Sequence, residues 1–156
     1  MHKASGLSWL VFLSVMGAHI MFYIGVDVSK AKPDCCLLPD VAGNRRRAKV
    51  VANSRVGIAG LLAWCAKQRV PAHELHAVME GTGVYHEQAA FALADAGVAV
   101  PIVNPAQVKD FGRSLGVRTK NDGADSVVLA RYGALPRTCS ANETGWKKRT
   151  PPTRHP

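Results

Sequence analysis

The sequence predicts an α/β domain built on a mixed sheet, with the element order β-β-β-α-β-α-β-α. Two observations lead to this fold class. Three short apolar runs open the domain in hairpin order, and later apolar runs alternate with segments whose apolar residues recur at helical spacing. Such an order favours helices on both faces of the sheet. With 156 residues, 47% of them hydrophobic, the chain has room for one domain with a buried core.

Three strands are predicted first. Residues 21–27 (MFYIGVD) form an apolar run that closes on an acid. Residues 34–39 and 46–52 give two further short strands, and Gly43-Asn44 between them is typical of a hairpin turn.

The first helix is predicted over residues 54–69, after a cap at Asn53-Ser54, and Pro71 stops it. Its apolar positions at helical spacing are Val56, Ile58, Leu61, Leu62, Trp64 and Cys65. Residues 75–80 (LHAVME) then read as a buried strand that runs into a glycine-rich turn.

Alternating elements complete the domain. A helix is predicted over 84–96, closed by Gly97, and a strand follows over 98–103. Asn104-Pro105 is typical of a helix cap followed by a first-turn proline. It opens a helix over residues 105–115 that ends at Gly116. A basic loop then leads to a helix over 122–134.

The ends of the chain fall outside this pattern. Residues 1–20 weakly resemble a signal peptide, but Met21 opens a well-formed strand, so we interpret them as an extension from an upstream start codon. Residues 21–135 form the predicted domain, and 136–156 are expected to be a disordered basic tail. The four cysteines include no C-x-x-C pair, which favours buried reduced thiols and a cytoplasmic protein without a membrane partner.

The formal net charge of +9 is concentrated in residues 41–70 and in residues 126–156, where six Lys and Arg residues stand against the single acid Glu143. Residues 41–70 carry seven Lys and Arg residues and no acid, whereas residues 71–100 carry four acids and no Lys or Arg. This pattern favours a protein that meets phosphates around an acidic site, although a merely soluble basic surface gives the same composition.

Four carboxylates occupy positions suited to a two-metal site. Asp27 and Glu80 close predicted strands, and Asp122 and Asp125 stand three apart on a predicted helix, so they share one face. Acids at the ends of buried strands need a cation to balance them. Two Mg²⁺ or Mn²⁺ ions would do so and would suit phosphodiester cleavage.

The segments YIGVDVSK, VVANSRVGIAGLLAWC and VMEGTGVYHEQ through to DGADSVVLARYGAL resemble the amino-terminal domain of DEDD transposases of bacterial insertion sequences, which are related to Piv invertases. The resemblance covers residues 21–135. It implies a ribonuclease-H-like (RuvC-like) fold in which Asp27, Glu80, Asp122 and Asp125 are the catalytic metal ligands. It also implies DNA as substrate, a structured guide RNA, a homo-oligomer, and a carboxy-terminal domain with a catalytic serine.

Nothing after Leu135 resembles that serine domain, so a truncated transposase is expected. The alternatives are a catalytically inactive remnant that still binds nucleic acid and, from the G-x-D-x-S pattern at the first strand, an actin-like kinase. Contacts with the nucleic-acid backbone are also expected at five positions near the acids. The alternative is that these side chains are solvated surface groups. These positions are Lys30, Thr82, Arg113, Arg118 and Lys120. The Arg45–Arg47 run allows the same two interpretations.

Overall fold

The computed structural model describes residues 21–41, 43–81, 83–116 and 122–136. The expectations for residues 1–20 and 137–156 lie outside this part of the chain. The strands are β1 (Phe22–Asp27), β2 (Asp34–Leu38), β3 (Arg47–Val50), β4 (Leu75–Glu80) and β5 (Ile102–Val103). The helices are α2 (Arg55–Lys67), the short 3₁₀ helix η1 (Ala72–Glu74), α3 (Tyr85–Asp95), α4 (Pro105–Ser114) and α5 (Asp122–Gly133).

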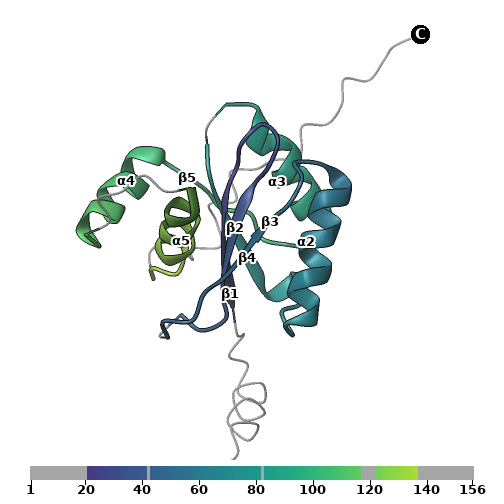
Figure 1. Ribbon diagram of the computed structural model, residues 1–156, viewed down its shortest axis with the longest axis horizontal. Helices are drawn as coiled ribbons and strands as arrows, with labels where there is room; N and C mark the ends of the chain where they lie inside the picture. Colours follow the sequence, from purple (N-terminus) through teal and green to yellow (C-terminus); the bar gives the residue numbers. More distant parts are fainter. Residues whose placement is uncertain (1–20, 42, 82, 117–121, 137–156) are drawn as a thin grey trace, which may run out of the picture.

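The strands form one mixed sheet in the order β3-β2-β1-β4-β5. β1 pairs antiparallel with β2, and β2 pairs antiparallel with β3. β4 lies parallel to both β1 and β5. Helices α2 and α3 cover one face of the sheet, and α4 and α5 lie on the other (Figure 1). The predicted mixed sheet with helices on both faces is therefore confirmed.

Alternation along β1 divides the core into two clusters. Ile24 and Val26 pack in the larger cluster with residues of α2 and α3, whereas Tyr23 packs in the smaller one with residues of α4 and α5. Because β1 is buried on both faces, its sequence is a nearly continuous apolar run. In the described part of the chain, no helix has both the length and the apolar character needed to cross a bilayer.

The helix ends follow the sequence signals. The Ser54 side chain caps α2 by accepting a hydrogen bond from the Gly57 backbone N–H at 3.0 Å. The Asn104 side chain caps α4 by accepting from the Ala106 N–H at 2.9 Å, with Pro105 in the first turn. Gly116, just past α4, has a φ of +74°, which a residue with a side chain rarely adopts.

Two predicted details were wrong. Val56 is 83% exposed, because at about 100° per residue it lies on the side of α2 opposite the buried residues Ile58 and Cys65. The strand predicted over 98–103 is reduced to Ile102–Val103. Ala99 and Pro101 still accept hydrogen bonds from β4 at their carbonyl oxygens, but proline has no N–H to donate, which interrupts the ladder.

Helix α5 packs directly onto the two central strands. A Cβ at Gly25 of β1 would overlap the Ser126 carbonyl oxygen, and a Cβ at Gly133 of α5 would overlap the Val78 side chain of β4. The absence of a side chain at both glycines allows the helix to lie unusually close to the sheet. This close packing fixes the position of the amino-terminal turns of α5, which carry two of the four predicted acids.

Candidate functional site

Asp27 and Glu80 lie side by side at one edge of the sheet. They end the parallel neighbours β1 and β4, whose register pairs Val26 with Met79, so the next position on each strand brings the two acids together. Asp27 follows Gly25 by two residues and Glu80 follows Val78 by two, which directs both side chains to the face covered by α5. Both residues are half-buried.

Helix α5 brings the second pair of acids to the same edge. Its carboxy-terminal half lies toward the opposite end of the sheet, where Arg131 donates a hydrogen bond to Asn44 of the β2–β3 loop at 3.4 Å. Its amino-terminal turns therefore lie at the end where β1 and β4 terminate. Asp122 is the first residue of α5, and its side chain lies outside the described part of the structure. Asp125 is half-buried one turn later.

The electrostatics of Glu80 show that these elements converge. Burial raises the pKa of the Glu80 carboxyl, and the charges of Asp27 and Asp125 raise it further. Strands β1 and β4 and helix α5 thus contribute one carboxylate each to a common electrostatic environment. Such a group is unfavourable while all its members are charged and no cation is near.

The donor set fits a hard divalent cation. All the contributing atoms are carboxylate oxygens, which Mg²⁺ and Mn²⁺ prefer. Among the residues whose side chains the structure describes, no three His, Cys, Asp or Glu residues are arranged tightly enough to hold a metal ion. The side chain of Asp122, the fourth predicted ligand, is not among the side chains that the structure describes. The three described acids therefore form an incomplete ligand set with the right chemistry.

The raised pKa of Glu80 predicts how stability depends on pH when divalent metal is removed by a chelator. The folded chain protonates Glu80 more readily than the unfolded chain, whose ordinary value is 4.5. The free energy of unfolding should therefore rise as the pH falls through the raised pKa toward 4.5, and decrease as the pH rises through the same range. We expect Glu80→Gln to flatten this part of the curve obtained from urea unfolding at a series of pH values.

Glu74→Gln is the matched control for this measurement, because Glu74 lies in η1 at the opposite end of β4. The control should keep the wild-type pH profile. If Glu80→Gln and Glu74→Gln gave the same profile, the electrostatic coupling of Glu80 to the other acids would be refuted.

Asn53 connects the two loops that follow the acidic strands. Its side-chain Nδ2 donates to the Ser29 carbonyl oxygen at 3.2 Å and to the Tyr85 carbonyl oxygen at 3.1 Å. Ser29 stands two residues after Asp27, and Tyr85 stands five residues after Glu80. The sequence suggested only a helix cap at Asn53-Ser54, a role that Ser54 fills. The cross-link was not predictable, because all of its contacts are between residues distant in sequence.

We expect Asn53→Ala to reduce Mn²⁺ affinity about tenfold, because the loops that position Asp27 and Glu80 would lose their shared donor. Isothermal titration calorimetry measures this effect. Ser54→Ala is the control, since it removes the cap of the same helix at a cost of about 1 kcal/mol without touching either loop. Both variants should lower thermal stability, but an equal loss of Mn²⁺ affinity in both would show that Asn53 acts only through the helix.

Asp34 is a carboxylate at this edge that the sequence analysis did not identify. The antiparallel register of β1 and β2 places it directly opposite Asp27, so the two side chains share a face. Burial raises the pKa of the neighbouring Cys35 thiol to about 12, and Cys65, Asp34 and Asp27 contribute to the rise. Asp34 thus adds negative charge beside the proposed ligands. The hairpin register, which the sequence did not determine, was needed to find it.

The structure describes only some of the residues that were predicted to contact nucleic acid. Lys30 is exposed, three residues past Asp27 in the loop after β1. Arg113 is exposed on α4, with its Nη1 3.3 Å from the Asp110 carboxylate. Thr82, Arg118 and Lys120 lie outside the described residues.

Comparison with known proteins shows which proteins the chain resembles. The model of the IS110-type DEDD transposase family, described as a transposase, matches residues 24–144. The pilin gene-inverting protein of Moraxella bovis is 36% identical over 112 residues, and that of Moraxella lacunata is 35% identical over the same length. These matches cover 72% of this chain and 34% of each relative, so the chain spans about a third of their length.

A solved structure supports the fold independently. T. thermophilus RuvC, in a complex with a Holliday junction substrate, superimposes with a TM-score of 0.52 and 18% sequence identity. The match covers 73% of this chain and 92% of the RuvC chain. The mixed sheet and its flanking helices are therefore a ribonuclease-H-like fold of the RuvC kind, as predicted.

Proposed function

Because the chain belongs to the IS110-type DEDD transposase family, we propose that it performs metal-dependent cleavage and exchange of DNA strands in transposition. The observation that carries the proposal is the convergence of Asp27, Glu80 and Asp125 from three separate elements at one sheet edge. The structural neighbour RuvC was solved with a Holliday junction substrate, which supports DNA as the substrate proposed here.

In this proposal Asp27, Glu80, Asp122 and Asp125 hold two Mg²⁺ or Mn²⁺ ions. When bound, such ions activate an attacking oxygen and stabilise the departing one in phosphodiester cleavage. The protein's own contribution is to hold the carboxylates in place. The close packing of α5 on Gly25 fixes the helix, and Asn53 fixes the loops after β1 and β4. Exposed Lys30 is positioned to contact the nucleic-acid backbone beside the acids.

Three further features are proposed from the resemblance to DEDD transposases. Complete recombination would require a further domain bearing a catalytic serine. A structured RNA would pair with the donor and target DNA. Several copies of the protein would assemble on the DNA ends.

The test is cleavage of fluorescently labelled duplex and four-way-junction DNA by the purified chain in Mg²⁺ or Mn²⁺. Nicked products that need divalent metal, and that fall about 100-fold or more in Asp125→Asn, would support the proposal. DNA binding without products in either metal would refute catalysis by this chain. That outcome would favour the second candidate function, a nucleic-acid-binding remnant of a transposase. The formal net charge of +9 is the observation that favours this candidate, because it supports nucleic-acid binding with or without catalysis.

A further inference from the structure

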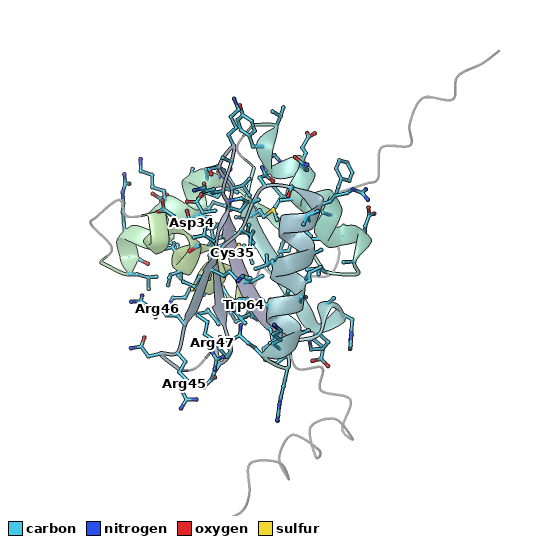
Figure 2. The ribbon with its side chains drawn as sticks, turned by 45° about the vertical axis from the view of Figure 1, so that its right-hand side comes forward. Asp34, Cys35, Arg45, Arg46, Arg47 and Trp64 are labelled. Atoms are coloured by element: carbon cyan, nitrogen blue, oxygen red, sulfur yellow. The ribbon has the colours of Figure 1, made fainter. Side chains whose placement is uncertain are left out.

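A dense group of cations lies at the end of the sheet opposite the acids. We call it the basic edge. It consists of Arg45, Arg46, Arg47, Lys67, Arg69 and Arg131. Figure 2 shows Asp34 toward one end of β2 and the three arginines toward the other. The β2–β3 loop also carries one exposed carboxylate, Asp40, beside Gly43, and the cations outnumber it.

One side of the basic edge lies on the face of the sheet covered by α2. Arg47 Nη1 donates to Gln68 Oε1 at 2.7 Å, which brings the start of β3 against the end of α2, where Lys67 and Arg69 are exposed. Lys49 Nζ lies over the Trp64 ring, 5.9 Å from its centroid. These contacts hold the cations of β3 and α2 next to each other.

The other side reaches the face covered by α5. Arg131 donates to the Asn44 side chain in the β2–β3 loop, and both residues line a hollow of about 400 Å³ together with Leu38 and Leu135. Burial raises the pKa of the Cys36 thiol, while Arg46 and Arg131 act to lower it, so both cations lie near that strand. The basic edge therefore surrounds the end of the β2–β3 hairpin from both faces.

Protection of an exposed strand edge does not account for this arrangement. Lysine and arginine on an edge strand discourage pairing with other chains, and Arg47 and Lys49 on β3 fit that role. Arg45 and Arg46, however, precede the paired register, which ends at Arg47 opposite Leu37. They are exposed in the loop, where there is no strand edge to protect.

We propose that the basic edge binds the phosphate backbone of duplex DNA. The loop of this hairpin, which carries Arg45 and Arg46, joins strands about 4.8 Å apart and can approach the major groove of DNA, which is about 12 Å wide, with cations of α2 and α5 at its two sides. Cations on both faces of a hairpin then meet phosphates on both walls of the groove. The major groove of an RNA duplex is too narrow for this arrangement.

The position of the basic edge separates it from the cleavage site. From the pairing of the strands, Arg45 and Arg46 lie on the order of 20 Å from Asp27. This distance corresponds to about six base pairs of duplex. The choice of DNA as the ligand rests on the proposed function. The basic edge would hold DNA that flanks the point of cleavage, and the acidic site would stay free for the scissile phosphate.

The test compares two double variants of the full chain that remove the same number of positive charges. Arg45→Gln with Arg46→Gln alters the basic edge. Arg55→Gln with Lys109→Gln removes two exposed cations from α2 and α4 instead. Fluorescence anisotropy gives the affinity for a labelled 30-base-pair duplex, about three helical turns, across a salt series. EDTA is present, so failure of the proposed metal chemistry would leave this readout unchanged.

We expect the basic-edge variant to bind DNA about tenfold more weakly and its plot of log affinity against log salt to be shallower by about 2. The control variant should stay close to wild type. Equal slopes in the two variants would overturn the proposal, because loss of net charge alone would then explain the effect. A larger loss of affinity for a hairpin RNA than for the duplex would overturn the choice of DNA. Circular dichroism melting confirms that both variants are folded.

Discussion

Gly25→Ala is expected to lower the free energy of unfolding by about 3 kcal/mol or more and to disrupt the acidic site. The added Cβ would overlap the Ser126 backbone, and a backbone obstruction cannot be relieved by rotating a side chain. Helix α5 would have to move away from β1, which would carry Asp125 away from Asp27. Urea unfolding monitors the stability, and Mn²⁺ titration monitors the site.

Gly60→Ala provides the matched control for this substitution. Gly60 lies in α2, and nothing lies within 4 Å of the position its Cβ would take. Alanine in an open helical position stabilises the helix by up to about 1 kcal/mol relative to glycine. The same chemical change should thus have opposite effects at the two sites. If the two variants had the same free energy of unfolding, that result would contradict the close packing of α5 on β1.

Asp27→Asn is expected to reduce metal-dependent DNA cleavage about 100-fold or more while raising the stability of the metal-free chain. The two effects have one cause. The carboxylate attracts a divalent cation when one is present, and it raises the energy of charged Glu80 when none is. A melting series in EDTA and a cleavage assay in Mn²⁺ measure the two effects separately.

Asp95→Asn, which removes an exposed carboxylate paired with Arg55, serves as the control for Asp27→Asn. It should leave cleavage unchanged and should not raise the melting temperature. A fall in the melting temperature of Asp27→Asn in EDTA would contradict the account, since it would show that Asp27 stabilises the metal-free fold.

The sequence predicted most of the fold because its signals are local. Caps such as Ser54 and Asn104, and Gly116 after α4, are determined by residues within one turn of the helix end. The shortened β5 was a predictable exception, because Pro101 lies within the predicted strand. The exposure of Val56 was also predictable, because helical spacing places this residue on the side of the helix opposite Ile58 and Cys65.

The sequence predicted which acids would lie together and which cation would suit them, but not the contacts that hold them in place. Strand ends and a shared helix face identified Asp27, Glu80 and Asp125, whose convergence the structure shows. What holds them in place depends on contacts between distant parts of the chain. Gly25 resembles any other strand glycine until α5 is placed on it, and Asn53 resembles a helix cap until its two carbonyl partners are known.

The central claim is that carboxylates from β1, β4 and α5 together form a divalent-metal site. Calorimetric titration of the chain with Mn²⁺ tests it most directly, using wild type, Asp27→Asn, Glu80→Gln and the control Glu74→Gln. The account predicts saturable binding in wild type and Glu74→Gln, and loss of that binding in both site variants. Unchanged Mn²⁺ affinity in Asp27→Asn and Glu80→Gln would contradict it.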